Sequence, residues 1–170
     1  MKRARKNERG QSLVEAAIAI PLVLMLGFNA VNLGYFWFMV LVLSAAPRQA
    51  VQYASQGGAA MAYISGQTGT AVQTMLLDNM TNAVGATSSN VSTQICVSAN
   101  GVVANVATCT VSGPTYSFPA AAADPEAPVY VLQRVDVAYT VHPIIPGGAF
   151  NVVLPSNLTF HRQVSMRSLY

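Results

Sequence analysis

The feature that most constrains this chain is a long apolar run near its N-terminus. From Ala16 to Ala46 there is no Asp, Glu, Lys, Arg or His. About 20 apolar residues are enough for a helix to cross a bilayer, whereas the apolar part of a cleaved secretory signal has only about 7–15. The run therefore predicts a membrane-spanning helix rather than an ordinary cleaved signal.

The basic residues are concentrated directly before this run. Five of the nine Lys and Arg residues lie in the first nine positions, and beyond Gly10 four basic residues face five acidic ones. Because basic flanks stay in the cytoplasm, we expect a cytoplasmic N-terminus and an extracytoplasmic remainder. The remainder has no basic patch to lie along phosphates, so a nucleic-acid partner is not expected.

The length of the chain leaves room for one modest domain after the helix. The sequence divides into a basic leader at 1–10, a long apolar transmembrane or assembly helix at 11–57, and an extracytoplasmic domain at 58–170. The helix is expected to start near Ser12 and to end at the glycine pair Gly57-Gly58.

The domain shows one helical segment followed by segments of period two. Apolar residues from Val72 to Ala83 recur at helical spacing, with Thr70 as the expected N-cap and Gly85 as the stop. Strands are expected at 91–97, 102–111, 129–141 and 158–166. In 129–141 the valines share one face, and the opposite face carries Arg134, Asp136 and Thr140. These patterns predict an α+β fold: a long N-terminal helix, then a short helix and an antiparallel sheet.

Cys96 and Cys109 are the only cysteines, and they bracket a short polar stretch that contains glycine. On the non-cytoplasmic side of a membrane we expect them to form a disulfide, which would stabilise the domain by about 3 kcal/mol at most. The alternative is two small buried thiols inside a sheet.

Two asparagines lie within the apolar run. Asn29 and Asn32 share one helical face and are flanked by Gly27 and Gly34. Polar amides in lipid need partners, and small residues let a second helix approach closely, so these four residues predict a helix-packing stripe. The alternative is that single asparagines near the end of a span are tolerated without a partner.

The sequence predicts no enzyme. His142 precedes a proline in a turn and His161 lies in an expected strand, and neither belongs to a cluster with metal-ligand spacing. A lone strand histidine is usually exposed or hydrogen-bonded without a catalytic role. No nucleophile motif or phosphate-binding loop is present, so we expect no cofactor, no metal and no small-molecule substrate.

The N-terminal motif resembles the class III signal of type IV pilins and pseudopilins. A basic leader, Gly10, four residues and then Glu15 precede the apolar run. The wider stretch ERGQSLVEAAIAIPLVLMLGFNAVNLGYFW is similar to the N-terminal signature of TadE-like pseudopilins of the tight-adherence (Tad) pilus machinery. VDVAYTVHPIIPGG and the terminal VSMRS run are similar to that family's C-terminal strands.

The resemblance implies a processing site and an assembly residue. In that family a membrane-embedded prepilin peptidase cuts after the glycine, which corresponds here to the bond between Gly10 and Gln11. The glutamate at the fifth mature position, here Glu15, then guides the subunit into a growing filament.

Elementary energetics agrees with that role for Glu15. An unpaired carboxylate at membrane depth costs about 2.5 kcal/mol or more, so it needs a partner. Cleavage after Gly10 creates one, because the new α-amine of Gln11 lies one helical turn away or beside the glutamate of a neighbouring subunit. The alternative is that Glu15 extends to the headgroups beside Arg9.

The resemblance therefore implies a minor pseudopilin of a Tad-type pilus that takes part in pilus assembly and surface adhesion. Its expected partners are the prepilin peptidase, other pilin or pseudopilin subunits, Tad inner-membrane assembly proteins and membrane lipid. Its expected location is the bacterial inner membrane, as a single-pass protein, with later incorporation into a cell-surface pilus. The alternative is a permanently anchored single-pass protein whose sheet domain binds an envelope partner.

Overall fold

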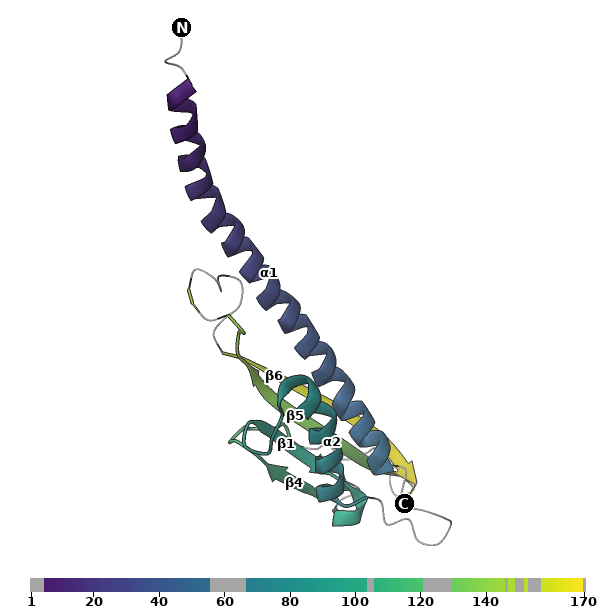
Figure 1. Ribbon diagram of the computed structural model, residues 1–170. Coiled ribbons are helices and arrows are strands. Elements are labelled where there is room, and N and C mark those ends of the chain that lie inside the picture. The colour runs from purple at the N-terminus through teal and green to yellow at the C-terminus, as the bar shows by residue number, and fades with distance from the viewer. Residues whose placement is uncertain are drawn as a thin grey trace. The chain divides into compact units, whose positions relative to one another are not determined.

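A computed structural model describes residues 5–55, 67–103, 106–120, 130–145, 147–148, 152 and 157–169. The fold is α+β, as predicted, with one long apolar N-terminal helix followed by a short helix and a sheet (Figure 1). The elements in chain order are α1 (Arg5–Ser55), α2 (Gly69–Val84), β1 (Val91–Cys96), the 3-10 helix η1 (Ser98–Asn100), β2 (Val102–Val103), β3 (Val106–Ala107), β4 (Cys109–Ser112), β5 (Tyr130–Val141) and β6 (Leu158–Leu169).

Helix α1 is continuous through Pro21 and Pro47 and includes the last residues of the leader. Its stretch Gly10–Ser55 is long and apolar enough to cross a membrane. The glycine pair expected to end the helix lies outside the described residues, and the described helix ends at Ser55.

The chain forms two compact units, which we describe separately. The first joins residues 1–37 to residues 142–158, and the second contains residues 38–141 and 159–170. The second unit holds the end of α1, the whole of α2 and the sheet.

The ends of α2 are set by one side-chain cap and one glycine. The prediction of Thr70 as the N-cap is wrong. The N-cap is Thr68, whose hydroxyl accepts a hydrogen bond from the backbone N–H of Ala71. The predicted stop is confirmed: Gly85 takes a left-handed conformation with φ 62°, and its N–H donates to the carbonyl of Thr81.

The sheet has the order β2-β3-β5-β1-β4, and β6 also pairs with β5. Strand β1 is antiparallel to both β5 and β4, while β3 meets β5 in parallel at Val106 and Leu132. The single strand expected at 102–111 is wrong. Antiparallel pairing of Val103 with Val106 turns the chain back there, so this stretch forms three short strands.

The main core of the second unit lies between the two helices and one face of the sheet (Figure 1). The alternating valines of β5 point to this face, as the period of two predicts, and β1 adds Val91 and Ile95. The fully buried helix side chains include Met39, Leu43, Val51, Val72, Leu76 and Met80.

The predicted disulfide between Cys96 and Cys109 is present. The two residues stand directly opposite each other in the antiparallel pair of β1 and β4. The bridge therefore joins a central strand to an edge strand, and it packs in a small cluster with Ala107 and Val131.

Candidate functional site

The residues of the expected processing site lie in the first turns of α1 that the structure describes. Gly10, Gln11 and Glu15 are all exposed. A methyl group added at Gly10 would meet no atom within 4 Å. Glu15 makes no hydrogen bond or ion pair with any described residue of the chain. The carboxylate of Glu15 is therefore exposed at the start of an apolar helical surface.

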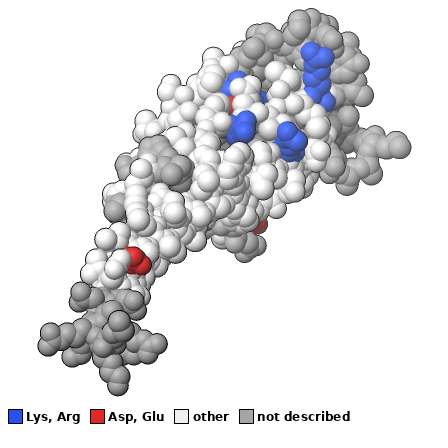
Figure 2. Space-filling view, turned by 90° about the horizontal axis from the view of Figure 1, so that it is seen from above, with Lys and Arg blue, Asp and Glu red and all other residues white. Residues whose placement is uncertain are grey.

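The surface of α1 is apolar and exposed from Ala16 to Leu24, and it stays largely exposed up to Leu33 except around Asn29 and Asn32. The large exposed side chains of this part of the helix are Ile18, Ile20, Leu22, Val23, Leu24, Leu26, Val31 and Leu33. Charged side chains are sparse over the described surface in Figure 2. A helix that exposes so many large aliphatic groups needs lipid or other helices around it.

The two asparagines of α1 have partners in the chain itself. The amide of Asn32 donates to the carbonyl of Ile145 and accepts from the N–H of the same residue, both at 3.1 Å. Asn29 accepts from the N–H of Val152 at 3.0 Å and donates to the carbonyl of Met25 at 2.8 Å. These amides are therefore paired without a second helix.

The flanking glycines of the predicted packing stripe are open. Gly27 and Gly34 are exposed, and a methyl group at either position would meet nothing within 4 Å. Packing of this side of α1 against another helix stays a prediction.

The face of the sheet opposite the helices carries a buried ionic cluster. Arg134 and Asp136 are 2% and 0% exposed, and the guanidinium donates to both carboxylate oxygens through Nε and Nη2. The Nε2 atom of His161, on β6, lies 2.9 Å from Oδ1 of Asp136. Three side chains from two neighbouring strands therefore meet around one buried carboxylate.

The segment after β4 covers this cluster. The Nη1 and Nη2 atoms of Arg134 donate to the carbonyls of Ala120 and Pro119, at 3.0 and 2.8 Å. The rings of Tyr116 and Phe118 each lie 5.7 Å from the ring of His161. Carbonyls and aromatic rings of the same segment thus exclude water from the ion pair.

The sequence placed Arg134 and Asp136 on one face but did not predict that the face is buried. An Arg-x-Asp pair within a strand was the available signal, because residues two apart point the same way. The covering segment is joined to the pair only by the fold, so no local pattern reveals it. The hydrogen-bonded role expected for a lone strand histidine agrees with the contact that His161 makes.

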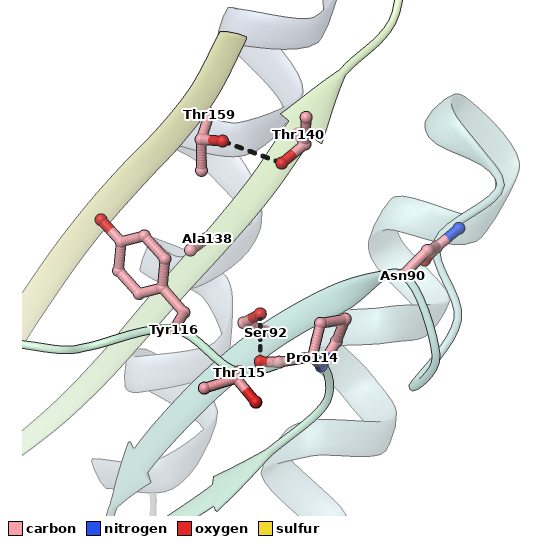
Figure 3. Close-up of a pocket in the computed structure, with 8 residues that line it drawn as sticks. All are labelled: Asn90, Ser92, Pro114, Thr115, Tyr116, Ala138, Thr140 and Thr159. Atoms are coloured by element: carbon pink, nitrogen blue, oxygen red, sulfur yellow. Dashed lines mark hydrogen bonds between the residues drawn. The ribbon is translucent and has the colours of Figure 1, made fainter. Parts of the chain in front are cut away.

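A polar groove lies beside the cluster (Figure 3). It has a volume of about 220 Å³ and no charged side chain in its lining, which consists of Asn90, Ser92, Pro114, Thr115, Tyr116, Ala138, Thr140 and Thr159. The hydroxyl of Ser92 donates to the carbonyl of Pro114 at 2.7 Å, and those of Thr140 and Thr159 are 2.8 Å apart. Such a lining suits an uncharged polar group of a partner.

Metal chemistry has no candidate centre in the described part of the chain, where no three His, Cys, Asp or Glu side chains gather. The chemical possibilities are thus an exposed anion on an apolar helix and a polar groove on a sheet domain. No family model, curated protein or solved structure matches the chain.

Proposed function

We propose that this chain is a minor pseudopilin of a Tad-type pilus, processed after Gly10 and inserted through Glu15 into a helical assembly. The observation that carries the proposal is the exposed carboxylate of Glu15, five residues after an exposed glycine and without a partner among the described residues. Directly after it comes a helix surface that exposes large aliphatic side chains. An anion there is costly in lipid, and a newly formed α-amine of a neighbouring subunit offsets that cost.

The proposal gives each part of the molecule a task. The basic leader holds the N-terminus in the cytoplasm, where the prepilin peptidase cuts the bond between Gly10 and Gln11. The apolar part of α1 first lies in lipid and then packs against equivalent helices of other subunits. The sheet domain, stiffened by the Cys96–Cys109 bridge, stays on the extracytoplasmic side.

The cleavage step is tested by mass spectrometry of the native protein in its host and in a host that lacks the prepilin peptidase. We expect a chain that begins at Gln11 in the first case and the full leader in the second. The variant Gly10→Ala is expected to keep the leader and to abolish piliation.

A matched variant controls for the substitution itself. Gly27→Ala makes the same change on the same helix, also with no atom within 4 Å of the added methyl, and is expected to be cleaved normally. Assembled pili that contain this chain with Met1 to Arg9 still attached would refute the proposal.

The polar groove favours a second candidate function, that of a permanently anchored protein whose sheet domain binds an envelope partner. This candidate predicts an uncut leader in cells that contain the peptidase. It also predicts that Glu15→Ala leaves the function of the protein unchanged.

A further inference from the structure

Three hydrogen bonds between asparagine side chains of α1 and backbone groups fasten a distant segment of the chain to this helix. We give the name strap to His142–Ile145 and Val152, which are among the described residues of this segment. Asn32 exchanges two hydrogen bonds with Ile145, in the manner of a neighbouring strand, and Asn29 accepts one from Val152. Asn32 is only 1% exposed. The strap is therefore held at a fixed height along the helix.

The distance along α1 from Gln11 to the strap is close to the thickness of the hydrocarbon core of a membrane. At about 1.5 Å per residue, Asn29 lies about 27 Å from Gln11 along the axis and Asn32 about 32 Å. The hydrocarbon core of a bilayer is about 30 Å thick. With the basic leader on the cytoplasmic side, the strap therefore falls where the lipid tails end on the opposite side.

The aromatic residues of α1 point to the same level. Four consecutive aromatic residues, Tyr35 to Phe38, begin three positions after Asn32, and Trp37 is 59% exposed. Trp and Tyr are enriched where lipid meets water, because their rings have an apolar body and a polar edge. Two independent features thus place the outer membrane boundary at one level of the helix.

The strap itself has the chemistry of a lipid-facing segment. Ile144 and Val152 expose 56% and 63% of their surface, although both are large aliphatic residues. The sequence from His142 to Asn157 contains no Lys, Arg, Asp or Glu. Exposed aliphatic groups without nearby charge gain free energy when they leave water for lipid.

We propose that the strap docks into the outer boundary of the membrane that α1 crosses, with Ile144 and Val152 among the lipid chains next to the headgroups. The strap thereby gives the protein a second membrane contact beside its helix. This inference rests on the membrane span of the proposed function, but not on cleavage or on filament assembly.

The test uses the full chain in phosphatidylcholine–phosphatidylglycerol vesicles. The native cysteines are bridged, so a single environment-sensitive fluorophore can be attached to Ile144→Cys or to Val152→Cys. Reference labels are placed at Leu22→Cys, in the middle of the span, and at Val111→Cys, an exposed valine of β4. Lipids with a nitroxide near the headgroup or deep in the tail then report the depth of each label.

We expect the labels at positions 144 and 152 to show blue-shifted emission and severalfold more quenching by the shallow nitroxide than the label at position 111. The label at position 22 should respond best to the deep nitroxide. Adding Asn32→Ala to the Ile144→Cys chain should reduce the shallow quenching, because it removes both hydrogen bonds to Ile145.

An unmodified chain provides a measurement that no substitution can disturb. Trp37 is the only tryptophan, so its own fluorescence should be quenched by the shallow nitroxide more than by the deep one. Equal quenching by both, or by neither, would contradict the assigned boundary.

The contradicting outcomes distinguish a failure of the strap inference from a failure of the membrane-spanning helix. If the label at position 22 lies in lipid while those at 144 and 152 behave like that at 111, the strap inference falls and the membrane helix stands. If the label at position 22 also lies in water, both fall. Blue-shifted strap labels that neither nitroxide quenches would assign the strap to a protein surface and would overturn the lipid contact.

Discussion

At the scale of single residues, Asp136 has a fully buried carboxylate that contacts the guanidinium of Arg134 and lies 2.9 Å from Nε2 of His161. A buried charge is tolerated only when its hydrogen-bonding capacity is filled. Here two nitrogens of Arg134 donate to the carboxylate, and a third nitrogen and Nη2 also reach backbone carbonyls of the covering segment. The pair therefore joins β5 to the segment that lies over it.

Removing one member of this pair leaves the other charge buried and alone. We expect Asp136→Ala to lower the free energy of unfolding by about 3–5 kcal/mol. The double variant Arg134→Met, Asp136→Leu removes both charges and should recover most of that loss. The measurement is guanidinium unfolding in detergent, followed by near-UV circular dichroism.

The control for the loss of an aspartate is Asp78→Ala on the exposed side of α2, which should change stability by less than about 0.5 kcal/mol. A loss at Asp136 no greater than that at Asp78 would mean that the pair carries no net stabilisation.

The individual residues differ in how far the sequence predicts their roles. The alternation of β5 correctly separates its valines from Arg134 and Asp136, because that pattern depends only on the two-residue period. The burial of the polar face depends on a segment from another part of the chain, and no local pattern encodes it. The same holds for the hydrogen bonds of Asn29 and Asn32 to the strap, whose residues lie more than a hundred positions away in the sequence.

At the scale of elements, the turn after β4 starts the segment that covers the cluster. Gly113 has φ 94°, and a methyl group added there would overlap the carbonyl oxygen of Val91 on the neighbouring strand. Only glycine lets the backbone turn this way and approach β1 so closely. The turn thus directs the chain toward Tyr116 and Phe118, which pack against His161.

We expect Gly113→Ala to cost about 3 kcal/mol or more, because backbone strain and steric overlap add. Gly85→Ala is the matched control, since Gly85 also has positive φ but has nothing within 4 Å of an added methyl. It should cost only about 1–2 kcal/mol. Hydrogen exchange over residues 114–120 should quicken in the first variant alone, and equal stability losses in the two would disprove the close-approach argument.

The elements most faithfully predicted are those with a long, regular pattern. Helix α1, helix α2 and strand β5 each repeat their apolar residues over several turns or pleats. The stretch 102–111 has the same composition as a strand, yet it folds into β2, β3 and β4. Val103 pairs with Val106, only three positions further along the chain, and this separation is shorter than any window over which alternation is recognised.

At the scale of the whole molecule, the chain joins two parts that need different surroundings. The exposed residues of α1 from Leu13 to Leu33 are almost all aliphatic, whereas the sheet domain has a buried core, a disulfide and a polar groove. Water suits the second part but not the first. Under the proposed function, the helix lies in lipid before assembly and among other such helices after it. Glu15 is the only charged residue between Gly10 and Pro47, so it is the charge that this change of surroundings would affect.

This difference predicts a specific effect of neutralising Glu15. In the glutamine variant, Glu15→Gln, the side chain keeps its size, the cost of a buried anion disappears, and the attraction to a neighbouring α-amine is lost. We expect this chain to be cleaved after Gly10 and kept in the membrane as in the wild type, but recovered in sheared pili severalfold less. Glu15→Asp, which keeps the charge, should restore part of the recovery. Quantitative immunoblotting of membrane and pilus fractions measures the recovery of each variant. Recovery of the glutamine variant in pili at the wild-type level would show that the charge does not direct assembly.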